Sequence, residues 1–186
     1  MKAIWCSVVA ILTTVVMAST AMAQLGPWNR EINSPARFQV LTQFGNAAVV
    51  DLETGLVWER SPSVNKEPWS PRNPDTAHIA CNTKPIGNRL GWRVPTIQEL
   101  ASLLDTTRSQ PPLTAGHPFV LNAEQQTGEF WSSTTAATDP DTPNSAWFAD
   151  FGSNNFPAGI VLYGSGDKAT LRFVWCVRTG PGTDVQ

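Results

Sequence analysis

The stretch Gly91-Trp92-Arg93-Val94-Pro95-Thr96-Ile97-Gln98-Glu99-Leu100 contains the strongest structural signal in the chain. Thr96 and Glu99 form a capping box, in which a hydroxyl and a carboxylate each satisfy a backbone N–H at the start of a helix. Apolar residues then recur at helical spacing, at Ile97, Leu100, Ala101 and Leu104. The pattern predicts a helix over residues 97–104 that packs one apolar face against a core.

A second helix is predicted before this one. Residues 61–74 contain four prolines, which predict an irregular surface loop. The following residues, 75–82, fit a short helix that Asp75 caps, with Ala77, Ala80 and Cys81 on one face. Cys81 would therefore point toward the core.

Strand signals lie on both sides of the two helices. Residues 37–41 fit a strand, and residues 48–59 fit two strands folded about a turn that ends at Gly55. Later strand-like stretches occupy residues 130–134, 145–151, 159–163 and 171–178, and turn-forming residues occupy 152–155 and 164–167. Strands and helices do not alternate regularly, which predicts an α+β fold with a mainly antiparallel sheet, two short helices and long loops.

The first residues have the pattern of a cleavable signal peptide. Lys2 precedes an apolar run over residues 4–17, and small residues end at Ala23. The run is shorter than the roughly 20 residues of a membrane-spanning helix, which argues against an anchor. We therefore expect a signal peptide over residues 1–23, an extended lead-in over 24–36, one domain over 37–179 and a tail over 180–186. The mature protein would be an exported bacterial protein, periplasmic or secreted, that does not span the membrane.

Two cysteines remain after the signal segment, Cys81 and Cys176. In an oxidising compartment, such a pair in a small exported chain favours a disulfide over two free thiols. The full chain has a net charge of −2 and no cluster of basic residues. Because proteins that bind nucleic acid neutralise phosphates with clustered lysine and arginine, we do not expect nucleic acid as a partner.

The sequence offers little catalytic chemistry. Its histidines, His78 and His117, have no second cluster of metal ligands near them, and the common nucleophile, phosphate-binding and zinc-protease motifs are absent. We therefore predict no catalytic residue, no cofactor and no metal. The alternative is a glycosidase-like pair of carboxylates, drawn from Glu59, Asp105, Glu129 and Asp150. Solvated or turn-stabilising acids are the favoured interpretation.

Tryptophan is abundant, and its positions suggest two roles. Trp131, Trp147 and Trp175 lie in predicted strands, where packing in the core is favoured over ligand contact. Trp69 lies in the proline-rich loop and is the better candidate for an exposed contact. In the turn over residues 139–144, the side chains of Asp139, Asp141 and Asn144 offer oxygen ligands, but an ordinary capped turn is favoured over a calcium site, which needs six or more ligands.

Several motifs in a fixed order resemble the Lcl C-terminal domain family, which is named for the terminal domain of a bacterial collagen-like adhesin. The motifs are Val50-Asp51, Thr54-Gly55-Leu56-Val57-Trp58, Cys81, Gly91-Trp92-Arg93-Val94-Pro95-Thr96 with Glu99-Leu100, Phe130-Trp131-Ser132-Ser133-Thr134, Ala146-Trp147 and Cys176-Val177-Arg178. The resemblance extends over residues 37–178. It implies a C-type-lectin-like fold, related to the formylglycine-generating enzymes, with a disulfide from the first helix to the last strand.

The sequence also lacks features on which the functions of related proteins depend. Cys81 and Cys176 stand where the bridge is expected, so no reactive cysteine pair remains for an oxidase. The Glu-Pro-Asn and Trp-Asn-Asp signatures of calcium-dependent lectins are missing. The family's adhesin member binds sulfated polysaccharides, but this chain has neither collagen-like repeats nor a matching basic cluster.

The functional hypothesis is therefore an exported, non-enzymatic domain that binds a glycan or protein ligand, as in adhesion. The candidate contact residues, most of them in loops, are Trp69, Asp139, Asp141, Asn144, Trp147, Asn154 and Asn155. Two alternatives are a structural subunit of a surface assembly and an enzyme acting on cell-wall or sulfated polysaccharide.

Overall fold

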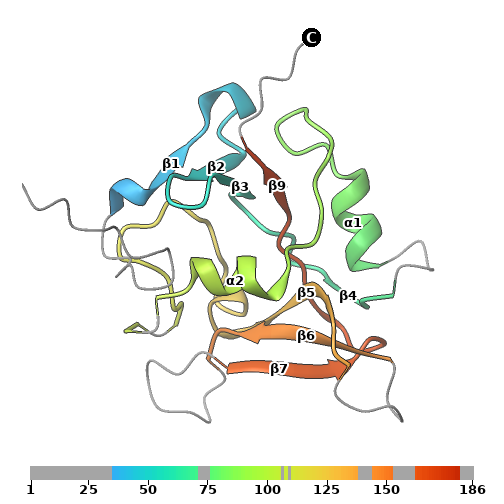
Figure 1. Cartoon of the computed structure of the whole chain (residues 1–186). Coiled ribbons are helices and arrows are strands. Elements are labelled where there is room, and N and C mark those ends of the chain that lie inside the picture. The colour runs from blue at the N-terminus through green and yellow to red at the C-terminus, as the bar shows by residue number, and fades with distance from the viewer. Residues whose placement is uncertain are drawn as a thin grey trace, which may run out of the picture.

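The computed structural model describes residues 35–70, 76–105, 107–108, 110–137, 144–152 and 162–180. Two sheets lie in different parts of the molecule, with helix α2 in front of the space between them and α1 at one side (Figure 1). The α+β class, the mainly antiparallel sheets and the two short α-helices are confirmed.

The first sheet has the strand order β1-β2-β3-β9 and is antiparallel throughout. Its strands are β1 (Phe38–Val40), β2 (Ala48–Asp51), β3 (Leu56–Glu59) and β9 (Val177–Thr179). The predicted hairpin is confirmed as β2 and β3. Gly55 ends its turn with φ 71°, a left-handed conformation that glycine adopts without steric cost.

The second sheet has the order β4-β8-β5-β6-β7. Its strands are β4 (Lys66–Glu67), β5 (Glu129–Thr135), β6 (Ser145–Asp150), β7 (Leu162–Asp167) and β8 (Arg172–Phe173). The pair β5–β8 is parallel and the other pairs are antiparallel. Strands β6 and β7 pair along their whole length, and β7 is the last strand at that edge (Figure 1).

Helix α2 (Ile97–Leu103) begins with the predicted capping box. The backbone N–H of Glu99 donates to Thr96 Oγ1 at 3.2 Å, and the N–H of Thr96 donates to Glu99 Oε2 at 2.8 Å. Helix α1 (Ala77–Thr83) is capped by Thr76, whose hydroxyl accepts from the N–H of Ile79. The expectation that Asp75 would be the cap is therefore wrong by one residue.

Three short 3-10 helices complete the described elements: η2 (Pro35–Arg37), η3 (Thr42–Phe44) and η4 (Gln125–Thr127). The lead-in was expected to be extended up to residue 36, but η2 already occupies its end. Proline fixes φ near the helical value, which suits the first position of such a turn.

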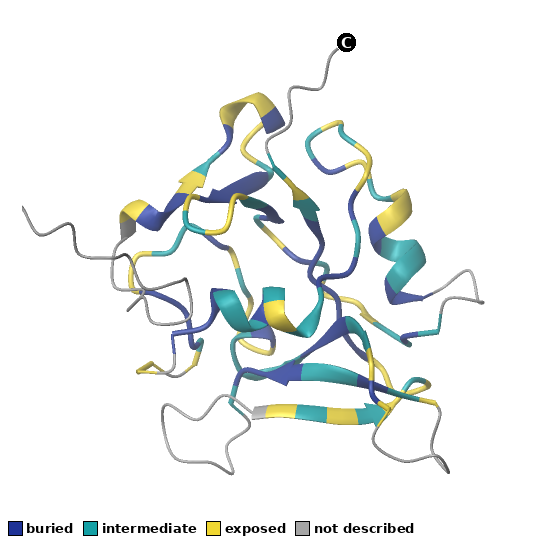
Figure 2. Cartoon of the chain, viewed as in Figure 1, coloured by how far each residue is buried: buried dark blue, intermediate teal, exposed yellow. Residues whose placement is uncertain are grey.

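The core has two clusters, and five tryptophans lie in them. In Figure 2 buried residues occur in both sheets and in both α-helices. One cluster surrounds the Cys81–Cys176 disulfide and includes Trp92 and Trp131. The other lies beneath α2 and includes Trp58 and Trp175, whose rings meet edge to face at 5.8 Å. The disulfide joins α1 to the segment just before β9, and this confirms the pairing predicted from sequence.

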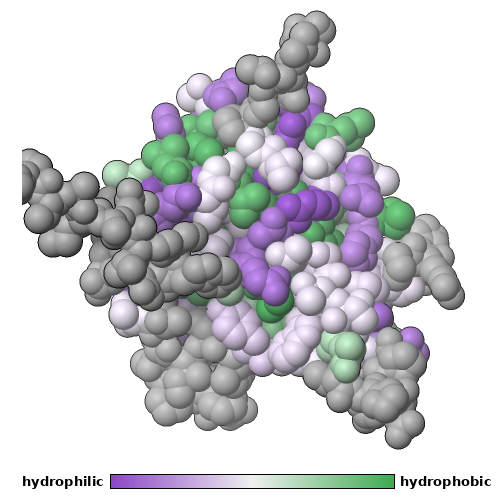
Figure 3. Space-filling view, in the orientation of Figure 1, coloured by the Kyte–Doolittle hydropathy of each residue, from purple (hydrophilic) through white to green (hydrophobic). Residues whose placement is uncertain are grey.

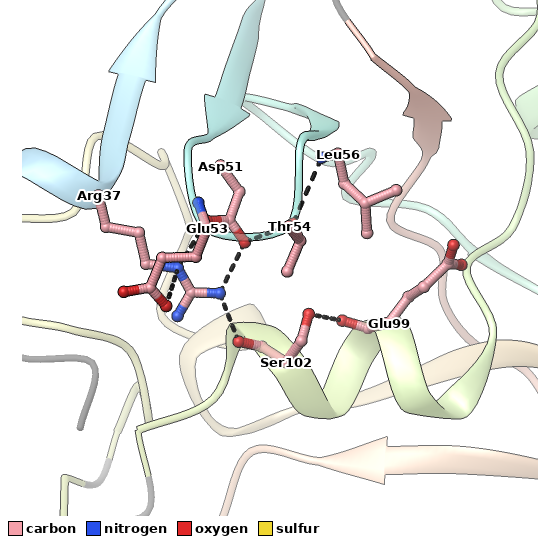
Figure 4. A network of polar contacts seen from close by, with 7 residues as sticks. All are labelled: Arg37, Asp51, Glu53, Thr54, Leu56, Glu99 and Ser102. Atoms are coloured by element: carbon pink, nitrogen blue, oxygen red, sulfur yellow. Dashed lines mark hydrogen bonds and ion pairs between the residues drawn. The ribbon is translucent and has the colours of Figure 1, made fainter. Parts of the chain in front are cut away.

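A buried ion pair ties the first sheet to α2. The guanidinium of Arg37 donates to both carboxylate oxygens of Asp51, at 2.7 and 2.6 Å, and Nη2 also donates to the carbonyl of Ser102 at 2.6 Å (Figure 4). Asp51 in turn accepts from the N–H of Glu53 and the hydroxyl of Thr54. The same carboxylate therefore orders the β2–β3 turn and holds the cation that anchors the end of α2.

Three strand predictions need correction. The proline-rich loop contains a two-residue strand, β4, because it pairs with the distant β8. Residues 171–178 form two strands, β8 and β9, which belong to different sheets. Residues 164–167 are not a turn but the second part of β7.

Glycines occupy β7 because neighbouring side chains fill the space beside them. A Cβ at Gly164 would collide with the ring of Phe148, and a Cβ at Gly166 would lie 2.6 Å from Nη2 of Arg172. Gly164 and Gly166, which suggested a turn in the sequence, are therefore strand residues that leave room for side chains from β6 and β8.

Candidate functional site

Trp69 is a core residue and not the exposed contact that the sequence predicted. It is 7% exposed, and its indole N–H donates to the carbonyl of Ser132 at 2.5 Å. His78 packs edge to face on its ring at 4.6 Å, and Nζ of Lys168 lies 4.3 Å from the ring centroid. The ring therefore joins α1 to the second sheet. The prolines near Trp69 in the sequence do not indicate whether its side chain is exposed.

The other predicted contact residues divide into two groups. Asp139, Asp141, Asn154 and Asn155 lie outside the described residues. Asn144 is exposed just before β6, and its carbonyl accepts from the N–H of Lys168 at 2.8 Å. Trp147 lies within β6 and is half-buried. Asn144 and Trp147 are thus the two predicted residues that the structure places at a surface.

Trp147 shares its sheet face with Tyr163, which sequence reasoning missed. Trp147 pairs with Ser165, and Ala149 pairs with Tyr163. Because paired residues point to the same side and side chains alternate along a strand, the two rings are diagonal neighbours on one face. Tyr163 is 41% exposed. The signal that could have found it is its place in an alternating strand, which the expectation of a turn at residue 164 concealed.

The remaining aromatic side chains of the described residues are engaged in the interior. Five tryptophans are buried, namely Trp58, Trp69, Trp92, Trp131 and Trp175. Phe148 is partly buried and packs against the cluster around the disulfide. Trp147 and Tyr163 are therefore the tryptophan and tyrosine rings that the described surface presents.

We call this surface the Trp147–Tyr163 face and define it by alternate residues of β6 and β7: Ser145, Trp147, Tyr163, Ser165 and Asp167. Figure 2 shows β7 alternating between exposed and intermediate residues beside the more buried β6. In Figure 3 the surface over these strands is pale, with near-neutral hydropathy, whereas strongly hydrophilic side chains gather above it around α2. The face thus combines two aromatic rings with small polar groups.

The back of the same two strands is firmly packed. The guanidinium of Arg172 lies between two rings, 4.3 Å from the centroid of Trp131 and 4.0 Å from that of Phe148. Its Nε donates to Glu129 at 2.5 Å. At the other end of β6, Ala149 is buried in the cluster that includes Leu100 of α2. Packing on both sides therefore fixes the backbone that carries Trp147 and Tyr163.

Burial raises the pKa of Tyr163 above its ordinary value. The phenol is thus un-ionised throughout the physiological range and can donate a hydrogen bond. Trp147 has one donor, its indole N–H, and the serine hydroxyls of the face both donate and accept. Asp167 supplies a carboxylate, of which Oδ1 accepts from the N–H of Ala169 at 2.8 Å. The face can therefore pack against an apolar surface and hydrogen-bond around it.

The carboxylates considered for a glycosidase-like pair have structural partners. Asp105 accepts from the N–H and hydroxyl of Thr107, and Asp150 accepts from the N–H of Gly152. Glu129 pairs with Arg172 as described above, and Glu59 pairs with Lys84. Each carboxylate therefore stabilises a turn or an ion pair.

Glu59 is deeply buried. Its side chain is 4% exposed, and burial raises its pKa, although the hydrogen bond and charge of Lys84 act in the opposite direction. Its backbone N–H donates to the carbonyl of Cys176 at 2.9 Å, and its carbonyl accepts from the indole of Trp175. Glu59 thus lies in the interior beside the disulfide.

Neither histidine is among the residues that define the aromatic face. Burial lowers the pKa of His78, as does the charge of Lys168, and burial lowers that of His117, as does the charge of Arg108. Over the described parts of the chain, no three His, Cys, Asp or Glu side chains gather closely enough to hold a metal ion. None of the helices in those parts is long and apolar enough to cross a membrane.

Comparison with known proteins assigns the family. The sequence model of the Lcl C-terminal domain matches residues 47–178, which include the disulfide, both α-helices and the aromatic face. The chain belongs to the Lcl C-terminal domain family, and the resemblance seen in the sequence is confirmed. No curated protein and no solved structure matches the chain significantly. The C-type-lectin-like relationship stays a prediction.

Proposed function

We propose that this protein is an exported, non-enzymatic binding domain that contacts a glycan or protein ligand through the Trp147–Tyr163 face. The observation that carries the proposal is the contrast between these two rings and the five buried tryptophans. Tryptophan and tyrosine supply large contact area with few rotatable bonds, and they are enriched among residues that dominate binding energy.

The two strands that carry Trp147 and Tyr163 are held in place by pairing and packing, which strengthens this proposal. A binding surface loses less conformational entropy when its side chains are already held in place. Strand β6 pairs with β5 on one side and with β7 on the other, and Phe148 packs beneath the glycine at position 164. The two rings therefore extend from a paired, packed part of the sheet rather than from a loop.

The non-enzymatic part of the proposal rests on the carboxylates. Asp51, Glu59, Glu99 and Glu129 each form an ion pair with a neighbouring arginine or lysine. A general acid or base must reach the proton that it transfers. These acids are instead committed to holding strands, helix ends and the second sheet together.

Export is supported by the disulfide and by the signal-like pattern of residues 1–23. Cys81 and Cys176 are 0% and 2% exposed and share an apolar cluster. Structural disulfides of this kind persist in oxidising compartments and are rare in the cytosol of mesophiles. The same arrangement suits a domain that works in the periplasm or outside the cell.

The test is an array of bacterial and host glycans and extracellular proteins, probed with the purified domain and two variants. Trp147→Ala removes one ring of the face, and Leu90→Ala removes an apolar side chain that is 65% exposed and lies between α1 and α2 in the sequence. We expect ligands that bind the parent and Leu90→Ala but lose most of their signal with Trp147→Ala. If every bound ligand keeps its signal with Trp147→Ala, the face is not the binding site.

A further inference from the structure

We propose that the Trp147–Tyr163 face is specific for uncharged oligosaccharides and discriminates against sulfated and other anionic glycans. The inference rests on the proposed function of the same face and adds the chemical class of its ligand. It is carried by three features of the described residues, namely the charges around the face, the alternation of rings with hydroxyls, and the width of the open strip.

The elements around the face contain acids but no basic residue. Strands β5, β6 and β7 and helix α2 have neither lysine nor arginine, whereas they include Glu99, Glu129, Asp150 and Asp167. Asp167 lies on the face itself and is exposed. An anionic ligand bound there would approach a carboxylate without a cation to compensate, and like charges at close range repel.

The nearest basic side chains are turned to other partners. Arg172 lies behind the sheet, between Trp131 and Phe148. Lys168 follows Asp167 directly but extends over the buried ring of Trp69, which belongs to the cluster on that same side. The basic side chains that an anionic glycan would need are therefore engaged by the residues packed behind the face.

The pattern of the face matches the surface of a pyranose. A sugar ring has one side made of C–H groups and a rim of hydroxyls, so it needs a flat apolar partner surrounded by hydrogen-bonding groups. Trp147 and Tyr163 are diagonal neighbours, and Ser165 stands directly opposite Trp147 on the next strand. The Tyr163 phenol and the serine hydroxyls can donate to or accept from sugar hydroxyls.

The open strip is narrow for a protein partner. Strand β7 is the edge of the sheet, and the Ala149 end of the face is covered by the cluster beneath α2. A stable protein–protein interface buries about 800 Å² on each partner. A strip two strands wide with a half-buried Trp147 and an exposed Tyr163 suits a chain of sugar units better than a globular surface.

The experiment compares uncharged and sulfated forms of the same oligosaccharides. Gluco-, galacto- and manno-configured hexasaccharides, each with and without sulfate, are titrated into the domain by calorimetry at low and at physiological salt. We expect at least one uncharged form to bind, its sulfated counterpart to bind about tenfold more weakly or not at all, and added salt to reduce this difference by screening.

Three variants connect that result to the face. Trp147→Ala is expected to weaken binding about tenfold or more, and Leu90→Ala to leave binding unchanged. Asp167→Lys reverses the only charge on the face and is expected to raise the affinity for sulfated forms relative to uncharged ones. Its fold is checked by the near-ultraviolet signal of the buried tryptophans.

The outcomes separate this inference from the proposed function. Binding of sulfated forms in preference to uncharged ones, with loss in Trp147→Ala, would overturn the inference and leave the function of the face intact. The same holds if only proteins bind in a Trp147-dependent way. Glycan binding that does not change in Trp147→Ala would overturn both. A preference for uncharged oligosaccharides that is lost in Trp147→Ala supports both the inference and the proposed function.

Discussion

The ring of Phe148 on β6 occupies the space that a side chain at Gly164 on β7 would fill. Strand β7 is the edge of its sheet, and Tyr163 directly precedes this glycine. The contact with Phe148 therefore supports the strand that carries Tyr163, on the opposite face of the sheet. Gly164→Val should therefore force Phe148 out of its packed position. We expect a loss of about 1–3 kcal/mol in the free energy of unfolding, measured by chemical denaturation.

A neighbouring substitution is the matched control for that measurement. Ser165 lies on the opposite face of the same strand and is exposed. Ser165→Val introduces the same side chain where space is open, and valine favours strands. It should be neutral within about 0.5 kcal/mol. Equal losses in the two variants would mean that the Phe148 contact does not explain the glycine.

The Arg37–Asp51 pair gives a second prediction. The Arg37 and Asp51 side chains are 2% and 0% exposed. Arg37→Met removes the cation but keeps a long apolar stem, and it leaves the Asp51 carboxylate buried without its partner. We expect a loss of about 3–5 kcal/mol in the free energy of unfolding by denaturant titration.

The double variant Arg37→Met with Asp51→Leu separates charge from packing. Removing both partners avoids an unpaired buried charge, and such replacements are often close to neutral. Asp51 also orders the β2–β3 turn through Glu53 and Thr54, so recovery should be partial. A double variant no more stable than Arg37→Met alone would show that the lost stability does not come from the isolated carboxylate.

The local elements could be predicted because their causes lie within a few residues. The capping box of α2 requires only Thr96 and Glu99, and the β2–β3 hairpin requires two short apolar runs on either side of a turn that ends at Gly55. The disulfide followed from cysteine number and compartment, with support from the family resemblance. In each case the sequence contains the whole physical reason.

The rest depends on contacts between distant residues. Strand β4 exists because β8 pairs with it, and those residues are more than a hundred positions apart. Trp69 is buried because α1 and the Ser132 carbonyl enclose it. For the candidate site, Trp147 could be predicted, but Tyr163 was missed. The two glycines that follow it suggest a turn and conceal the alternation of the strand unless the positions of Phe148 and Arg172 are known.

Glu59 predicts a pH dependence of stability. Burial raises its pKa in the folded protein above the value of 4.5 for a free glutamate, so folding favours the protonated form. The stabilisation is fully present below the unfolded pKa and is lost as the pH rises through the folded pKa. In Glu59→Gln this contribution should be absent, because glutamine is neutral at every pH.

The measurement is the free energy of unfolding of the parent and of Glu59→Gln from about pH 3.5 to pH 8, a range that includes ordinary carboxyl titration. We expect the parent to lose stability relative to Glu59→Gln as the pH rises. Lys84 is more than a third exposed and can turn toward solvent in the variant. If the parent instead becomes more stable than Glu59→Gln as the pH rises, the ion pair with Lys84 affects the pKa of Glu59 more than burial does.

Glu99 should behave in the opposite way. Burial alone would raise its pKa, but hydrogen bonds from Arg93 and Thr96 together with the charge of Arg93 lower it. Its stabilisation is present above the unfolded pKa and is lost as the pH falls through the folded one. Glu99→Gln keeps one acceptor for the capping box, so we expect a loss near neutral pH of about 1 kcal/mol that shrinks in acid. A loss that is independent of pH would assign the role of Glu99 to helix capping alone.

The disulfide predicts both chemical protection and stability. Cys81 and Cys176 are 0% and 2% exposed, and thiolate exchange requires access to a sulfur atom. We expect the native protein to resist mild reductant and thiol labelling by intact mass, and to become reducible in denaturant. The bridge spans 95 residues of sequence, and removing a native disulfide from a small exported domain costs roughly 2–5 kcal/mol.

The double variant Cys81→Ala with Cys176→Ala tests the second part, because alanine leaves no free thiol and little strain. Its free energy of unfolding should fall by that amount, with α1 released first, since the bridge attaches this short helix to the segment before β9. Hydrogen exchange at the N–H of Ala80, which donates to the carbonyl of Thr76, reports on α1 directly. Unchanged protection there, with lower global stability, would show that the bridge acts through the unfolded chain alone and that Trp69 and the core already hold α1 in place.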